Sequence, residues 1–344
     1  MAPLVGLTYD LRDDYLDEGY TDVEVAEFDS RATIDALDTS IRALGYETER
    51  IGSVRALVVA LAGGRRWDLV FNIAEGLQGR CREAQVPALL EAYGVPYTFS
   101  DPLTAALTLD KALAKRLVTS AGLPTPPFAL LRNLEETQRL GLRYLLFVKP
   151  NAEGTGKGID GRSVVTTPAE LREVAAALLA DCAQPLLVEE FLPGREFTVG
   201  ILGTAEAARA LGTMEIKVPG DRWGIYSLPV KENCEEYVHY SRLGDGPLRQ
   251  AVQDLAIASY RLLDCRDAGR VDIRLDRNDA PCFLEINPLP GLHPNHSDLP
   301  MIATRENMPY RDLIGNIIGH ALDRNAAAGG TRRPGAPLQE LCRV

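Results

Sequence analysis

The stretch that decides the fold is Gly269–Asn287, which reads GRVDIRLDRNDAPCFLEIN. Apolar and polar residues alternate in both of its halves, which predicts two strands with one apolar face each. A short polar segment joins the halves and predicts a hairpin. If the loop of this hairpin is symmetric, Asp272 lies opposite Glu285 and Arg270 lies opposite Asn287, all on one face of the sheet.

The two facing carboxylates need an explanation, because like charges opposite each other across a ladder destabilise a sheet. A divalent cation between Asp272 and Glu285 would remove the repulsion. Magnesium is often held by one or two carboxylates while phosphate and water oxygens complete its shell, and Asn287 adds a neutral oxygen. The alternative is a solvated hairpin face whose acids pair with Arg270 or Arg274.

Two further motifs precede the hairpin. The Gly-rich stretch Glu153–Gly158 follows a predicted strand that ends at Lys149, and its glycines would let backbone N–H groups approach a phosphate closely. The stretch Leu187–Glu196, LVEEFLPGRE, offers backbone groups, apolar side chains and a carboxylate, as an adenine and ribose site requires. Each motif alone is equally compatible with an ordinary turn. Their occurrence together in one chain favours a nucleotide site.

The composition limits the class of protein. The chain has 344 residues, 46% of them hydrophobic and 25% charged, which is enough for two or three domains with cores of their own. Its apolar runs are much shorter than the roughly 18 residues that cross a bilayer, and no signal-peptide pattern is seen, so we expect a cytoplasmic protein without a membrane partner. A net charge of −11 argues against nucleic acid. The six scattered cysteines predict free thiols.

We expect three structural units and a tail. Residues 1–104 alternate strand and helix patterns, as a parallel α/β domain does, whereas 105–188 predict a small α+β domain with a flexible loop. Residues 189–323 predict a third domain with several strands, and 324–344 have little to bury and predict a flexible tail. The polar segment 214–243 is weakly periodic and predicts a long loop.

In this order the motifs resemble the ATP-grasp superfamily, and within it the D-alanine:D-alanine ligases. The resemblance extends from the first strand to about residue 323. Its most specific stretches are Leu109–Leu117, Val148–Gly154, Val188–Val199, Gly269–Asp272 and Leu284–Gly291. It implies an ATP-grasp fold of mixed α/β and α+β type, with a central lid domain and a C-terminal catalytic domain built on an antiparallel sheet. It also implies ATP, two Mg²⁺ ions (or Mn²⁺), small amino-acid substrates and a homodimer.

The resemblance also implies roles for individual residues. Those expected to bind ATP are Lys111, Lys149, Glu153, Gly154, Thr155, Gly156, Gly158, Glu189, Glu190, Phe191, Leu192, Glu196 and Lys231. Within this set Glu189 and the Leu192 backbone would bind adenine and Glu196 the ribose. Those expected to hold metal are Asp272, Glu285 and Asn287, and those expected to act in catalysis are Arg270 and Lys231. Those expected to contact the amino acids are Glu27, Glu75, Glu232, Gly291 and Ser297.

Two acidic residues depart from the family pattern. Glu75 stands where the ligases have His, and Glu232 stands where they have Tyr. These carboxylates either attract a cationic or amine-bearing substrate or pair with Arg80, Arg82 or Lys231, and the sequence favours neither interpretation.

The implied reaction has two steps. A carboxylate attacks the γ-phosphate of ATP to give an acyl phosphate, and the amine of a second substrate then displaces phosphate. The first hypothesis is therefore an ATP-dependent ligase that forms a dipeptide or an amino-acid amide. Three alternatives remain: a specialised ligase that attaches an amino acid to a non-peptide metabolite, a nucleotide-binding protein without ligase turnover, and a kinase that stops at a phosphorylated product.

Overall fold

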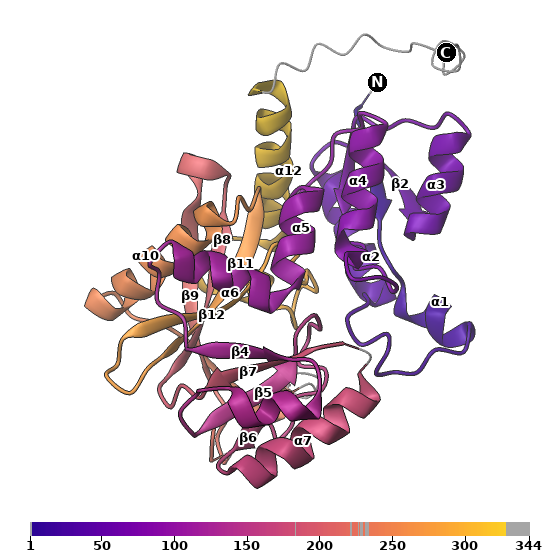
Figure 1. Cartoon of the computed structure of the whole chain (residues 1–344). Helices are drawn as coiled ribbons and strands as arrows, with labels where there is room; N and C mark the ends of the chain where they lie inside the picture. Colours follow the sequence, from indigo (N-terminus) through magenta and orange to yellow (C-terminus); the bar gives the residue numbers. More distant parts are fainter. Residues whose placement is uncertain are drawn as a thin grey trace.

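The computed structural model describes residues 2–327 except 183, 221, 226, 228, 229 and 231–233. Lys231, Glu232 and residues 328–344 of the expected tail therefore lie outside the described residues. The described chain forms three units, each built around its own sheet (Figure 1). None of its helices has the length and apolar character needed to cross a bilayer.

The first unit contains the expected parallel sheet. Its central strand β1 (Leu4–Thr8) lies between β2 (Glu47–Gly52) and β3 (Leu69–Asn72). The helices of this unit are α1 (Arg12–Asp17), α2 (Arg31–Ala43), α3 (Val54–Ala62) and α4 (Gln85–Ala92), with the short turn η1 (Arg82–Ala84) before α4. Helix α2 begins where Ser30 Oγ accepts a hydrogen bond from the Thr33 N–H at 3.3 Å, and its apolar stripe is buried.

The second unit is the expected small α+β domain. Its antiparallel sheet has the order β4 (Phe128–Leu131), β7 (Leu186–Glu190), β5 (Leu146–Pro150) and β6 (Val164–Val165). Helix α7 (Pro168–Asp181) packs against three of these strands and against η2 (Leu134–Arg139). It begins at Thr167, whose side chain accepts a hydrogen bond from the Glu170 N–H at 3.2 Å, as its Ser/Thr-x-x-Glu pattern predicts. Helices α5 (Pro102–Leu109) and α6 (Lys111–Ser120) precede the sheet.

The third unit is built on an antiparallel sheet of five strands. Their order is β10 (His239–Arg242), β9 (Arg209–Lys217), β8 (Glu196–Leu202), β11 (Ala268–Leu275) and β12 (Pro281–Asn287). Its helices include α9 (Cys234–Tyr237), α10 (Pro247–Leu262) and α11 (Asp298–Arg305), with the short turn η3 (Ala205–Ala207) between β8 and β9. The predicted loop over 214–243 is wrong at both ends, because β9 and β10 occupy them.

The last helix, α12 (Tyr310–Ala327), joins the first and third units. It packs against α2 and α11, and one apolar core includes Ile34 of α2, Leu299 of α11 and Leu313 of α12. The tail predicted from residue 324 is wrong for 324–327, which continue this helix. Arg324 explains why: its guanidinium pairs with the buried Asp267 carboxylate at 2.8 Å.

Candidate active site

Strands β11 and β12 form the hairpin that the alternation predicts. Asp272 faces Glu285 and Arg270 faces Asn287 in the strand register, as expected. The register shifts by one residue between Asp272 and Ile273, which leaves Leu284 without a paired residue, so the symmetric loop assumed in the prediction is not what produces this pairing. Arg270 donates one hydrogen bond to Asp272 Oδ2 at 2.9 Å and a second to Asp298 Oδ2 at 2.5 Å. The guanidinium is therefore fixed at the edge of the acid pair.

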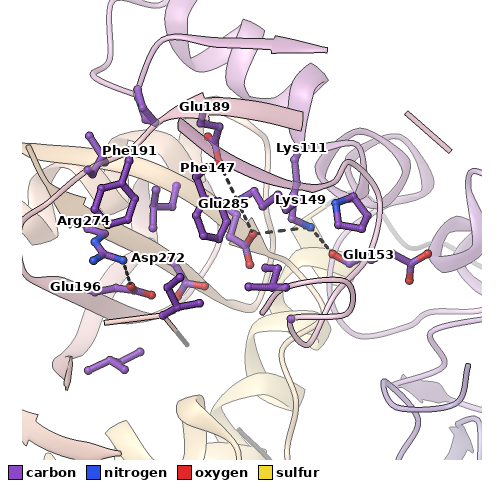
Figure 2. A pocket seen from close by; sticks show the side chains of 18 of the residues that line it. Lys111, Phe147, Lys149, Glu153, Glu189, Phe191, Glu196, Asp272, Arg274 and Glu285 are labelled. Carbon is purple, nitrogen blue, oxygen red and sulfur yellow. Dashed lines mark hydrogen bonds and ion pairs between the residues drawn. The ribbon is translucent and has the colours of Figure 1, made fainter. Parts of the chain in front are cut away.

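A cleft of about 910 Å³ lies between the sheets of the second and third units, and Figure 2 shows its lining. The expected ATP-binding residues that line it are Lys111, Lys149, Glu153, Gly156, Glu189, Glu190, Phe191, Leu192 and Glu196. Asp272 and Glu285 of the hairpin line it as well. Gly154 and Thr155 line a neighbouring cavity, whereas Gly158 lines neither.

One end of the cleft holds a cluster of lysines and glutamates (Figure 2). Glu189 is buried between Lys115 Nζ at 2.6 Å and Lys149 Nζ at 3.1 Å. Burial alone would raise the pKa of Glu189, but the two lysines outweigh it and lower the pKa. Burial likewise opposes the charge of Lys149, yet Glu189 and Glu285 raise its pKa. The Glu189 carboxylate, which was expected to bind adenine, therefore pairs with Lys115 and Lys149.

Lys111 and Lys149 converge on the same carboxylate. Their Nζ atoms lie 3.7 and 3.6 Å from Glu285 Oε2. Lys111 opens helix α6, and the helix start is tied to the end of β5 because the Asn151 side chain bonds both Asp110 Oδ1 and the Ala112 N–H. Two elements distant in sequence therefore present two cations to one point in the cleft, as binding of a polyphosphate requires.

The other end of the cleft is aromatic and apolar. Phe191 meets Trp223 edge to face with ring centroids 5.5 Å apart, and the Arg274 guanidinium lies over the Phe191 ring. Arg274 also pairs with Glu196 Oε2 at 3.1 Å, which orients the carboxylate expected at the ribose. Glu190 also lines the cleft, and its carboxylate pairs with Arg143 at 2.9 Å.

The Gly-rich loop crosses from the cleft to the first unit. Lys111 Nζ donates a hydrogen bond to the Glu153 carbonyl at 2.5 Å, and Lys157 Nζ pairs with the Glu153 carboxylate at 3.0 Å. The loop requires glycine at position 158, where φ is +71° and a Cβ would lie 2.7 Å from Pro150 Cγ. On the far side Gly154 N–H donates to Glu27 Oε1 at 2.5 Å.

A second cavity of about 1110 Å³ adjoins the cleft, and Lys111 and Asp298 line both. Every described residue expected at the amino acids lines this cavity: Glu27, Glu75, Gly291 and Ser297. Ser297 Oγ accepts a hydrogen bond from the His293 N–H at 2.9 Å, and a Cβ on Gly291 would lie 2.8 Å from this oxygen. Glu232 lies outside the described residues.

The wall that the first unit gives to this cavity is acidic. Glu27 Oε2 pairs with the Arg82 guanidinium at 2.6 Å, and Glu75 and Glu83 lie beside them. Burial, followed by the charge of Glu83, raises the pKa of Glu75 well above its usual range. Burial raises the pKa of Glu83 to about 7, although Arg82 opposes the shift.

The donor set of the hairpin fits Mg²⁺. Asp272, Glu285 and Asn287 offer hard oxygen atoms on one face, and the buried Asp298 Oδ1 nearby accepts no hydrogen bond from the described residues. The described chain has no group of three or more His, Cys, Asp or Glu residues suited to a metal. A Mg²⁺ ion here would therefore complete its shell with amide, phosphate or water oxygens.

Three residues of the site were not predicted from the sequence: Glu83, Lys115 and Asp298. Arg82 and Arg274 were considered only as possible partners of other acids. The acidic partners of Lys115 and Arg82 lie far away in the sequence, so no local pattern indicates these two residues. Asp298 was detectable, because it directly follows the expected Ser297 at the start of a helix.

Comparisons with known proteins agree with this geometry. Residues 117–319 match the family model described as the C-terminus of D-ala D-ala ligase. A D-alanine:D-alanine ligase from Bordetella pertussis is 37% identical over 78% of this chain and 82% of its own length. An uncharacterized protein from Sinorhizobium fredii is 33% identical over 83% of this chain and 85% of its own.

The fold is shared with solved structures. The crystal structure of a D-alanine:D-alanine ligase from Bacillus anthracis with ATP superposes with a TM-score of 0.72 at 21% identity, over 95% of this chain and all of that one. This likeness confirms the ATP-grasp fold expected from the sequence, with its parallel and antiparallel sheets.

Proposed function

The chain belongs to the D-alanine:D-alanine ligase family, and on that premise we propose that it joins two small amino acids into a dipeptide by means of an acyl phosphate formed from ATP. One observation carries the proposal: Lys111 and Asp298 line both the lysine-bearing cleft and the cavity expected to hold the amino acids. A γ-phosphate in the cleft and a carboxylate in the cavity would therefore meet beside Arg270. The relatives do not favour a specialised ligase that acts on a non-peptide metabolite.

ATP would lie with its base against the aromatic end of the cleft and its phosphates at the lysines. Glu196, held by Arg274 at 3.1 Å, would accept hydrogen bonds from the ribose hydroxyls. Lys111 and Lys149 would bind phosphate oxygens, and the loop Glu153–Gly158 would cover them. Asp272, Glu285 and Asn287 would hold two Mg²⁺ ions, which would neutralise phosphate charge.

Arg270 is suited to the developing negative charge of both steps. Its guanidinium is fixed by Asp272 and Asp298 at 2.9 and 2.5 Å, so little reorganisation is needed as charge builds up. The attacking carboxylate forms a bond to the γ-phosphorus while the bond to the β–γ bridging oxygen breaks. The second amine then forms the amide bond, and phosphate leaves with one oxygen of the original carboxylate. Closure of the Gly-rich loop would exclude water.

We propose D-alanine and similar small amino acids as the first substrates to test, because the named relatives are D-alanine:D-alanine ligases. We also propose a homodimer that associates through the first unit, and a cytoplasmic location, where ATP and free amino acids are available. Light scattering of the purified chain measures whether it is a dimer.

The function is tested by incubating the protein with ATP, Mg²⁺ and a panel of D- and L-amino acids, singly and in pairs. We expect ADP and a dipeptide to appear in equal amounts, with mass spectrometry identifying the product. ADP formation with a phosphorylated amino acid and no amide would instead indicate a kinase. Nucleotide binding without ADP release for any pair would contradict the ligase assignment.

A further inference from the structure

Two acids on the wall of the amino-acid cavity lack an ion-pair partner in the described chain, although the charge of the nearby Arg82 lowers the pKa of both against the effect of burial. Glu83 is 8% exposed and lines the cavity together with Glu75. Neither carboxylate takes part in a hydrogen bond or an ion pair with any described residue. Glu83 was not among the residues expected from the sequence, and it comes from η1, directly after Arg82.

The cations of this region are bound elsewhere. Arg82 donates to Glu27 Oε2 at 2.6 Å and to the Ala152 carbonyl at 2.9 Å. Arg80 pairs with Asp110 at 2.6 Å. Arg80 and Arg82, two of the three residues that could pair with Glu75, therefore pair with other acids. The third, Lys231, lies outside the described residues.

Glu27 is occupied as well, although the family resemblance places it at a substrate ammonium. Its two carboxylate oxygens bind Arg82 and the Gly154 N–H, so it links the phosphate-covering loop to the first unit. The polar groups that remain open to a ligand on this wall are the carboxylates of Glu75 and Glu83.

Buried carboxylates without partners are costly, and a bound cation removes the cost. An ammonium group supplies one positive charge and three N–H donors. The α-ammonium of an ordinary amino acid would match one of the two carboxylates, and a second amino group would match the other.

We propose that Glu75 and Glu83 form an ammonium subsite, and that one of the two amino acids joined by this chain is a short diamino acid. The proposal rests on the proposed function and narrows its substrate class. A side chain ending in an amine replaces the methyl group of alanine at this wall.

The test is calorimetric titration of the full chain, with Mg²⁺ and a non-hydrolysable ATP analogue present. The ligands are alanine, diaminopropionate and diaminobutyrate, each as both enantiomers. We expect at least one diamino acid to bind about tenfold or more tightly than alanine of the same configuration, since a buried ion pair with good geometry is formed. Equal or weaker binding of every diamino acid would overturn the proposal.

Variants then locate the subsite. Glu83→Gln and Glu75→Gln should each weaken the binding of the diamino acid about tenfold or more. Each should weaken the binding of alanine by a smaller factor. Glu47→Gln, an exposed acid of β2 in the same unit, is the matched control and should change neither affinity. Equal losses for both ligands would mean that these acids serve only the α-ammonium or the fold, and would overturn the proposal.

Ligase activity and binding of a diamino acid are tested by separate measurements. Binding is measured without turnover, so a missing ligase activity leaves the calorimetric comparison intact. The comparison of ligands on the unaltered protein also decides the proposal if a variant does not fold.

Discussion

Glu189 Oε2 lies 3.1 Å from Lys149 Nζ, and both residues are buried in the wall of the cleft that we assign to ATP. The other carboxylate oxygen binds Lys115, which has no exposed surface. A buried acid therefore positions the lysine that we place on the phosphates, and the interaction links α6, β5 and β7.

Glu189→Gln should damage both stability and ATP binding. Removing one charge leaves two buried lysines short of a partner, which costs about 3–5 kcal/mol of unfolding free energy. Because Lys149 is no longer held in position for the phosphates, the KM for ATP should rise about tenfold or more. Denaturant unfolding and initial rates measure the two effects. Arg311→Ala, which breaks the exposed pair with Asp312, is the control and should cost under about 1 kcal/mol.

Glu285→Gln should abolish metal-dependent ADP release while the fold is retained. The variant keeps the shape of the side chain but removes the charge that faces Asp272 and the phosphates. We expect a loss of about a hundredfold or more in kcat, with a shifted Mg²⁺ requirement. Glu206→Gln, an acid of the same unit that is 95% exposed, should leave the rate unchanged. A fully active Glu285→Gln enzyme would refute the metal assignment.

Gly158→Ala should impair closure of the phosphate loop. At this position φ is +71° and a new Cβ would lie 2.7 Å from Pro150 Cγ, so the loop has to shift. We expect the KM for ATP to rise about tenfold. Gly161→Ala is the matched control, since its Cβ would meet no atom within 4 Å. Equal KM values for the two variants would show that the loop conformation does not matter for ATP.

Glu83→Gln should make the ligand-free protein more stable at neutral and higher pH. Burial raises the pKa of Glu83 from 4.5 to about 7, with Arg82 opposing the shift and Glu27 adding to it. A raised pKa means that the fold favours the protonated acid, so stability is present at low pH and is lost as the pH rises through about 7. The glutamine of the variant does not ionise, so the variant does not lose this stability as the pH rises.

The expected gain is as much as about 3 kcal/mol near pH 8 and close to zero near pH 4. Denaturant unfolding at these two values measures it, without ligand. A variant less stable than the parent near pH 8 would mean that the Glu83 carboxylate has a cationic partner in the free protein.

The fold was largely predictable wherever one strand face is buried and the other is polar. The hairpin of β11 and β12 follows from alternation alone, but the shift of its register between Asp272 and Ile273 was not predicted. Strand β2 was not recognised because its sequence ETERIG has few apolar residues and little burial. Strand β10 is an exposed edge strand of four residues, HYSR, and forms only because β9 offers it a partner.

The site was predictable where its residues lie in local motifs. The Gly-rich loop, Lys149 and the acid pair were found in this way. The partners were not predictable, because they depend on contacts between segments that are distant in the sequence. The family resemblance implied that Glu189 binds adenine, and only the packing of α6 and β5 against β7 shows that Lys115 and Lys149 enclose it. Arg82 was considered a partner for Glu75, but it pairs with Glu27.

The most direct test of the ligase mechanism follows one oxygen atom. An amino acid that the enzyme uses is labelled with oxygen-18 in its carboxylate, and the phosphate released during turnover is analysed by mass spectrometry. Activation as an acyl phosphate predicts one labelled oxygen in each phosphate derived from the labelled carboxylate. Unlabelled phosphate, with dipeptide still formed, would contradict the account.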